Sequence, residues 1–182
     1  MAQQSPTILP IIDSKTATIC TPSMSSDNTT KDFQQSEGFQ SSVPWPGRTF
    51  IIRSQENGKV ITFLDGEVIL DKPGGLGTFR WRCVEKEGWL GFRDPSSARY
   101  LGYDKEGWLR CAVKWHQDWE YICARKRPDG GYIPLVLVEM QLLPLGVRIE
   151  ETKDGAEDKV KIRNWDSEGI VWDFIEVPCP SK

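Results

Sequence analysis

Residues 116–132 bring together side chains that can do chemistry. His116 is the only histidine of the chain, and Asp118 and Glu120 follow it closely. A histidine beside carboxylates can transfer protons, and a thiol such as that of Cys123 can act as a nucleophile. One hypothesis is therefore a small enzyme. No metal-ligand motif, phosphate loop or dinucleotide signature accompanies these residues, so we expect neither a metal ion nor a cofactor.

Basic residues form a second candidate site. Three of them stand together at 125–127, two lie on a matching strand of an earlier repeat, and one is close in sequence. The set is Arg80, Arg82, Lys114, Arg125, Lys126 and Arg127. Grouped cations of this kind favour contact with an acidic protein surface or a phosphorylated ligand. The alternative is a solvated turn that keeps the protein soluble.

The tripeptide Gln117-Asp118-Trp119 resembles the Gln-x-Trp motif of ricin-type lectins, which implies sugar binding. Such lectins carry the motif in most of their repeats. The equivalent tripeptides here, at 77–79 and 170–172, lack the glutamine. Sugar binding is therefore a third hypothesis, and the competing interpretation makes Trp119 an ordinary core aromatic.

Length, charge and cysteine content exclude several classes of protein. The chain has 182 residues and a net charge of −3, which suits one domain with a tail and argues against a nucleic-acid binder. The cysteines are Cys20, Cys83, Cys111, Cys123 and Cys179. Their wide spacing without a CxxC pair predicts free thiols, and hence a reducing, cytoplasmic location. We also expect no membrane span and a monomer.

The first 43 residues differ in composition from the rest. Fourteen of them are Ser or Thr and five are Gln, and they include no Trp or Tyr. Such a segment cannot bury enough apolar surface to offset the entropy of ordering. We therefore predict a disordered tail over 1–43 and a folded domain over 44–182.

The folded region reads as short strands separated by Gly-containing turns, without a sustained helical period. Strands open at 49–54, 89–94 and 132–137, about 40 residues apart. Each unit also holds two aromatics separated by one residue, which share one face of a strand and predict a core position. These pairs are Phe79/Trp81, Trp119/Tyr121 and Trp172/Phe174, and Cys83 and Cys123 extend the same face.

Three units of four antiparallel strands predict an all-β protein with a single β-trefoil: six strands close a barrel and six form hairpins at one end. A β-sandwich is the alternative, but it does not explain a threefold aromatic pattern. Glu120 and Asp173 occupy equivalent places between the paired aromatics. If the protein is an enzyme, the catalytic candidates are His116, Asp118, Glu120 and Asp173. The competing expectation places Glu120 and Asp173 on the solvent side, and His116 and Asp118 either on the solvent side or, if the strand begins later, in a loop.

Residues 89–111 and 118–132 resemble the fascin-like, actin-crosslinking β-trefoil superfamily. More narrowly, 48–177 is similar to small fungal proteins of this group. The resemblance implies a non-enzymatic interaction module that binds actin or another acidic protein. A lone trefoil implies single-site binding, because bundling needs two sites.

A second hypothesis is a small cyclase- or isomerase-like enzyme, or a ligand carrier, in a fungal secondary-metabolite pathway. It predicts a pocket lined by tryptophan with a buried carboxyl group.

Overall fold

The computed structural model describes residues 41–152, 155–164 and 166–178. It contains twelve β-strands and one short 3-10 helix, η1 (Asp118–Glu120). The strands are β1 (Thr49–Ser54), β2 (Val60–Leu64), β3 (Glu67–Asp71), β4 (Trp81–Lys86), β5 (Trp89–Arg93), β6 (Tyr100–Tyr103), β7 (Leu109–Val113), β8 (Ile122–Lys126), β9 (Tyr132–Val138), β10 (Gln141–Thr152), β11 (Gly155–Ile162) and β12 (Trp172–Glu176).

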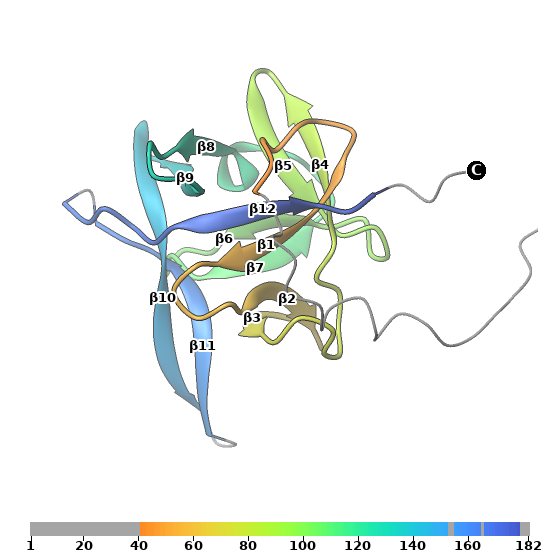
Figure 1. Cartoon of the computed structure of the whole chain (residues 1–182), viewed down its shortest axis with the longest axis vertical. Helices are drawn as coiled ribbons and strands as arrows, with labels where there is room; N and C mark the ends of the chain where they lie inside the picture. The colour runs from red at the N-terminus through yellow and green to blue at the C-terminus, as the bar shows by residue number, and fades with distance from the viewer. Residues whose placement is uncertain (1–40, 153–154, 165, 179–182) are drawn as a thin grey trace, which may run out of the picture.

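Six of the strands close a barrel. β1 pairs with β4, β4 with β5, β5 with β8, β8 with β9, β9 with β12, and β12 returns to β1. The other six form the hairpins β2–β3, β6–β7 and β10–β11. Each unit thus gives its first and fourth strands to the barrel and its middle two to a hairpin (Figure 1). The predicted β-trefoil is confirmed.

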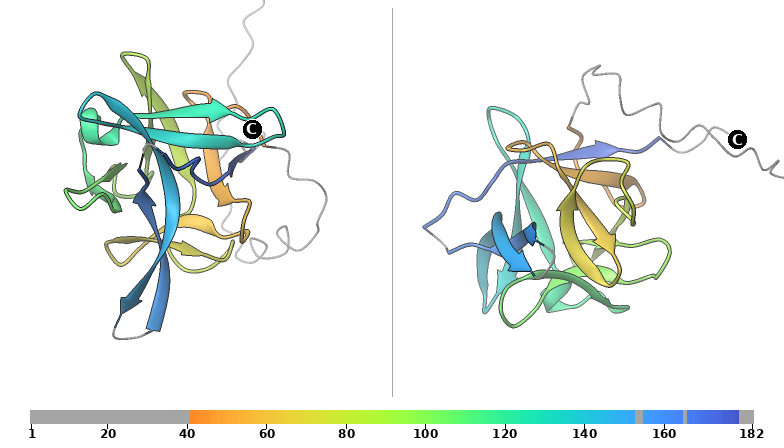
Figure 2. Two further views of the ribbon diagram at one scale, coloured as in Figure 1. Left: turned by 90° about the vertical axis from the view of Figure 1, so that its left-hand side faces the viewer. Right: turned by 90° about the horizontal axis from the view of Figure 1, so that it is seen from below.

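The third unit departs from the other two in length. Its hairpin, β10–β11, is paired from Leu145↔Ile162 to Thr152↔Gly155 and extends well beyond the barrel (Figure 2). This hairpin makes the third unit longer than the other two.

Tight turns follow the glycine signals. In the β2–β3 turn, Asp65 and Gly66 have φ of 49° and 93°. Two successive positive φ angles define the hairpin turn whose twist matches that of the flanking strands. Glu87 and Gly88 form a similar turn between β4 and β5, with φ of 55° and 86°.

The centre of the core is an aromatic cluster around Phe174 of β12. Its ring centroid lies 6.2 Å from that of Phe50 on β1, 5.4 Å from that of Phe92 on β5 and 5.5 Å from that of Tyr132 on β9. Phe174 therefore contacts the first strand of every unit. Each ring that leaves water contributes about 2–3 kcal/mol, so this cluster is a large share of the folding free energy.

The core prediction is confirmed for Trp81, Cys83, Tyr121, Trp172 and Phe174, which are all buried. It is wrong for Trp119, whose side chain is 43% exposed. Residues 118–120 form η1, so the fourth strand of unit two, β8, begins only at Ile122. Trp119 is therefore not part of the strand, and the alternation of inward and outward side chains does not apply to it. Cys123 is only partly buried.

Residues 1–40, which make up most of the predicted disordered tail, lie outside the described residues, as do Cys20 and Cys179. Ser42 N–H donates to the carbonyl of Phe174 at 2.8 Å, and Phe174 N–H donates to Ser41 Oγ at 3.2 Å. Residues 41–42 thus lie along β12. The domain boundary at residue 44 stays a prediction.

Two glycines let the segment 114–121 lie directly on the β5–β6 strands. A Cβ on Gly91 would lie 2.6 Å from Nε2 of His116, and a Cβ on Gly102 would lie 2.8 Å from the carbonyl oxygen of Trp119. Neither glycine has a positive φ, so close approach is the reason for the missing side chain. These strands therefore position the residues of the candidate site.

We predict that Gly91→Ala lowers the free energy of unfolding by about 1–3 kcal/mol, the usual cost of overpacking. The imidazole of His116 cannot withdraw, because it is held between Tyr100 and Tyr121. Urea denaturation measures the loss. In a His116→Ala background the same change should cost much less, because the clashing ring is gone. Equal costs in both backgrounds would contradict this packing.

Candidate functional site

An open hollow of about 530 Å³ lies between η1 and the β6–β7 hairpin, and we call it the first hollow. It is lined mainly by Arg110, Trp115, Gln117, Asp118, Trp119 and Glu120. Trp115 is 72% exposed and Trp119 is 43% exposed. Two large aromatic side chains left in solvent beside polar groups are typical of a binding site rather than of a core.

Two ring contacts hold Trp119 in place. Its ring stacks on Tyr103 with centroids 5.4 Å apart, and the guanidinium of Arg110 lies 5.3 Å from its ring centre. Arg110 Nε is buried, and none of the described residues accepts a hydrogen bond from it. The first hollow therefore has a rigid aromatic wall and a cation with spare donor capacity.

Glu120 is 3% exposed, so the expectation that it points to solvent is wrong. It turns inward because η1 places it over Gly102, and its Oε2 accepts a hydrogen bond from Gln117 N–H at 3.4 Å. Burial raises the pKa of this carboxyl, although Gln117 N–H and Arg110 oppose the rise. The first hollow thus has the buried carboxyl group that the enzyme-or-carrier hypothesis predicted.

His116 is also buried, at 8% exposure, so the expectation that it points to solvent is wrong, although it lies in the loop between β7 and η1. Its ring stacks on Tyr100 at 5.3 Å and meets Tyr121 edge-on at 5.1 Å, and Nε2 lies 3.3 Å from the carbonyl oxygen of Leu90. Burial lowers the pKa of the imidazole. His116 does not line the first hollow, so it supports the site from behind.

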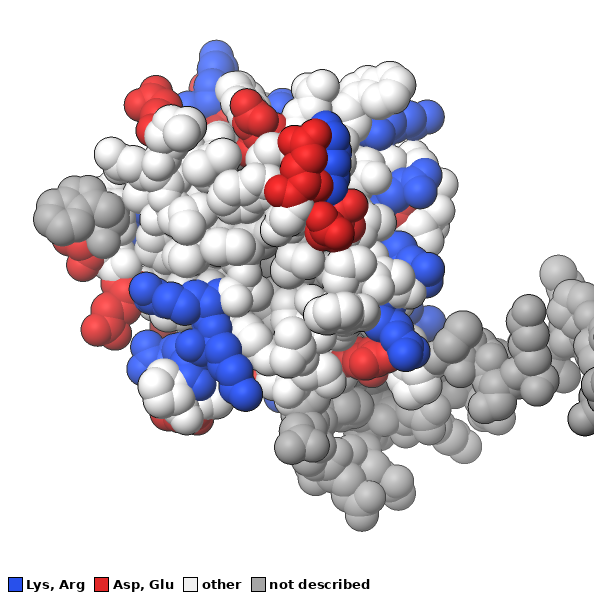
Figure 3. Space-filling model, turned by 90° about the horizontal axis from the view of Figure 1, so that it is seen from above, with Lys and Arg blue, Asp and Glu red and all other residues white. Residues whose placement is uncertain are grey.

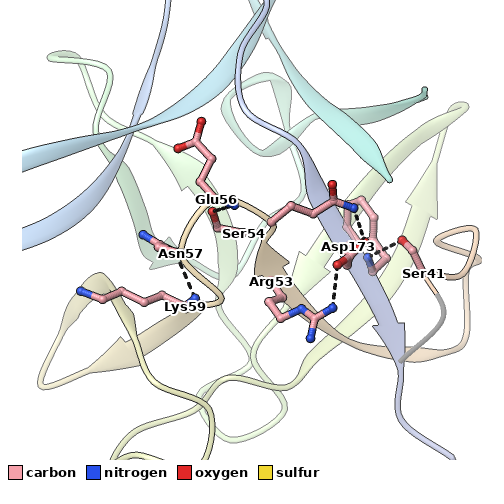
Figure 4. A network of polar contacts seen from close by, with 9 residues as sticks. Ser41, Arg53, Ser54, Glu56, Asn57, Lys59 and Asp173 are labelled. Carbon is pink, nitrogen blue, oxygen red and sulfur yellow. Dashed lines mark hydrogen bonds and ion pairs between the residues drawn. The ribbon is translucent and has the colours of Figure 1, made fainter. Parts of the chain in front are cut away.

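Asp173 is buried away from the first hollow, so the expectation of a solvent-facing carboxylate is wrong here too. Arg53 Nη2 donates to its Oδ2 at 2.8 Å, and Gln55 Nε2 donates to its Oδ1 at 2.8 Å (Figure 4). Both oxygens are therefore engaged in holding β1 to β12. Of the four catalytic candidates, only Asp118 and Glu120 line the first hollow.

The described cysteines are poor nucleophiles. Burial raises the pKa of Cys83 and of Cys111 to about 12, and it raises the pKa of Cys123 as well. A thiol reacts as its thiolate, so these groups are inert at neutral pH.

The six candidate basic residues are spread over several elements. Arg125 and Lys126 are exposed on β8, whereas Arg127 is tied to Asp129 at 2.9 Å and to Glu168 at 3.8 Å. Arg82 faces Arg93 across β4 and β5. Arg80 Nε is buried, and Lys114 is exposed. In Figure 3, Lys and Arg side chains form several groups, with Asp and Glu between them and a broad uncharged centre.

Two further hollows adjoin the first. The middle hollow, of about 520 Å³, shares Trp119 with it, and the far hollow, of about 660 Å³, shares Lys161, Ile162 and Asn164 with the middle one. We call these three neighbouring hollows, which share lining residues, the groove. Trp108 lies at its far end.

Sequence reasoning missed Trp115, Arg110 and the far hollow. Trp115 offered one signal, because it is a large aromatic outside the repeat pattern. The far hollow left none, since it is assembled from residues near 108, 148 and 163 that only tertiary structure brings together.

Among the described residues, no three His, Cys, Asp or Glu side chains are grouped closely enough to hold a metal ion. Within the same part of the chain, the structure has no helix of the length and apolarity that crossing a membrane requires.

No protein-family model matches the sequence. No curated protein matches it either.

Solved structures do match the fold. The ricin B-like lectin of Macrolepiota procera, solved with lactose, has a TM-score of 0.56 at 16% identity, over 73% of this chain and 98% of the lectin. An endo-β-galactosidase of Clostridium perfringens that releases GlcNAcα1-4Gal scores 0.54 at 12% identity, over 72% of this chain and 33% of the enzyme. A GH43 β-1,3-galactosidase scores 0.57 at 12% identity, over 75% of this chain and 28% of the enzyme.

The chain thus spans nearly all of the lectin but only about a third of either enzyme. At these identities the likeness concerns the fold, and it agrees with the threefold pairing described above. The chain is a β-trefoil protein.

The single histidine allows a direct check of the packing behind the site. We predict an imidazole pKa below 6.5, measured from the ring-proton shifts in NMR spectra of protein without a histidine tag. Between the folded-state pKa and 6.5 the unfolded chain binds more protons than the folded chain. The free energy of unfolding therefore falls as pH drops below 6.5 and levels off below the folded-state pKa.

His116→Phe is the matched control, because it keeps a ring against Tyr100 but cannot be protonated. As pH drops through the same window, the free energy of unfolding of this variant should rise relative to that of the unsubstituted protein. A difference that does not change with pH would contradict a buried neutral imidazole.

Proposed function

We propose that this protein binds carbohydrate in the first hollow. The observation that carries the proposal is the pair of solvent-exposed tryptophans, Trp115 and Trp119, beside the polar side chains of Gln117 and Asp118. A pyranose ring has an apolar face of C–H groups and a rim of hydroxyls. Its apolar face suits an indole, whose π surface is negative, and its hydroxyls suit carboxylate, amide and guanidinium groups.

Rigidity favours the same function. Trp119 is held by its stack on Tyr103 and by the cation of Arg110, so little side-chain entropy is lost when a ligand contacts its exposed part. Arg110 also lines the hollow, so its guanidinium can meet the hydroxyl rim of a sugar ring. The hollow, at about 530 Å³, is of ordinary size for a small-molecule site.

The structural neighbours support the proposal. One is a lectin solved with lactose, and the other two are enzymes named for galactose-containing substrates. The fold alone does not assign the function, because β-trefoils serve many. The fold is consistent with the interpretation of Gln117-Asp118-Trp119 as part of a sugar site. Trp119 is exposed, whereas the competing interpretation placed it in the core.

A glycan array followed by calorimetry tests the proposal. We expect Trp119→Ala to weaken binding of the best glycan about tenfold or more, because a stacking surface is lost. Trp115→Ala should weaken it as well. Trp45→Ala is the matched control, since Trp45 is 67% exposed but lines none of the three hollows. An array without binding, or equal losses for all three variants, would overturn the proposal.

Glu120 favours a second candidate, a proton-transferring enzyme or ligand carrier. A buried carboxyl beside two tryptophans is an arrangement that can protonate a bound apolar molecule. This candidate requires that the pKa of Glu120 lie above its ordinary value of 4.5, so that the carboxyl keeps its proton at higher pH. Carbon-detected NMR titration, with Glu120→Gln to assign the signal, measures this pKa, and we expect a raised value. A value at or below 4.5 would remove the candidate.

The fascin-like hypothesis of actin binding stays a prediction. The basic residues on which it depends are dispersed, and Arg127 is neutralised by its own acidic neighbours.

A further inference from the structure

We propose that the groove takes an acidic oligosaccharide, whose anionic group, a carboxylate or a sulfate ester, sits in the far hollow. This inference rests on the carbohydrate binding proposed above and adds the charge of the ligand and the direction in which it extends. The far hollow is separated from the first one by the middle hollow, so a ligand that reaches both must be longer than one sugar.

The far hollow is rich in cations. Arg148, Lys161 and Arg163 line it, against one carboxylate, Asp166, among its described lining residues. Within the described part of the chain, no acidic side chain forms an ion pair with any of these three cations. Like charges grouped without partners repel one another, so the hollow attracts an anion.

A neighbouring cation on the same hairpin is neutralised. Lys159, two residues before Lys161 on β11, has Glu67 and Glu150 each at 2.7 Å and Glu157 at 3.8 Å. The chain is acidic overall, with 26 acidic and 23 basic residues, so carboxylates are not scarce. What distinguishes the far hollow is that three cations without ion pairs to described residues line one hollow, two strand positions from a lysine that carboxylates surround.

Lys161 is held in position by the fold. Its Nζ lies 4.3 Å from the centre of the Trp108 ring, and the two residues form a β-bridge between separate units of the trefoil. The next residue is also anchored, since Ile162 N–H donates to the carbonyl of Gly107 at 2.9 Å. The cation is thus presented on a fixed stem.

Arg163 is held in position by a glycine. A Cβ on Gly146 would lie 2.6 Å from its Cγ and 2.7 Å from its Cδ, so the stem crosses β10 where no side chain stands. Its backbone N–H donates to the carbonyl of Pro144 at 2.8 Å. An arginine whose aliphatic stem is already ordered loses less entropy when its guanidinium forms a bidentate contact with an oxyanion.

These features favour a glycan whose anionic group sits in the far hollow and whose middle part is uncharged, because Asp104, Glu106 and Glu139 line the middle hollow. The exposed indoles of the first hollow offer stacking surface to sugar rings, and the fixed cations of the far hollow match a carboxylate or a sulfate. A neutral oligosaccharide would cover the far hollow and leave three cations without counter-charge, at a desolvation cost. An acidic one would exchange that cost for charge-assisted hydrogen bonds.

The test is an array in which uronate-bearing and sulfate-bearing glycans are printed beside their neutral counterparts, the methyl esters and the unsulfated sugars. We expect the acidic members to bind and the neutral ones to bind at least tenfold more weakly. Added salt should weaken the acidic glycans selectively. The array also distinguishes a carboxylate from a sulfate ester.

Calorimetry with the best acidic glycan then locates the anion. We expect Arg163→Gln and Arg148→Gln each to weaken binding about tenfold and to reduce its salt dependence. Arg148 is exposed, so its variant should fold even if Arg163→Gln does not. Arg125→Gln is the matched control, with the same charge change on exposed β8, away from the groove.

The outcomes separate the two proposals. If acidic and neutral glycans bind equally and the arginine variants bind like the unsubstituted protein, sugar binding stands and the acidic ligand is wrong. If no glycan binds, both proposals are wrong. If inorganic sulfate binds as tightly as the glycan and Trp119→Ala has no effect, the far hollow is a small-anion site and the acidic oligosaccharide is wrong.

Discussion

The contact of one aromatic ring with the three repeats organises this protein. Phe174, near the end of the fold, meets Phe50, Phe92 and Tyr132, which come from the first strand of each unit. No unit can bury its own aromatic residues alone, so the units are stable only together. The barrel that results closes on itself from β1 through β12, and it supplies a rigid base for the hairpins and for η1.

The candidate site lies against this barrel at glycines, where the lack of a side chain allows close approach. Gly91 and Gly102 lie where His116 and η1 press onto β5 and β6, and Gly146 lies where Arg163 crosses β10. Close approach at these points buries residues that the sequence offered as catalytic candidates, so that they pack behind the site or in its wall. His116 becomes a neutral ring behind the site, and Glu120 becomes a buried carboxyl at its wall. What remains for a ligand is an aromatic surface with polar neighbours.

The distribution of ion pairs separates structural charges from available ones. Asp173 with Arg53, and Lys159 with Glu67, join strands that are far apart in sequence. Such partly buried pairs hold the trefoil in register. The cations of the far hollow have no such role among the described residues, and the groove connects them to the exposed tryptophans. In the part of the chain that the structure describes, residues of the same types thus form ion pairs within the fold in one place and stay without them in another.

The sequence by itself determined the fold, because turn glycines and paired aromatics at Trp81, Trp172 and Phe174 repeat with the period of the units. Periodic burial is a local property that a strand pattern reports directly. The same pattern was wrong for Trp119, where a 3-10 turn delays the strand and exposes the indole. Only the tertiary structure decided the site. A groove is made where hairpins from different units meet, and no spacing along the chain encodes that Trp119, Lys161 and Arg163 line one surface.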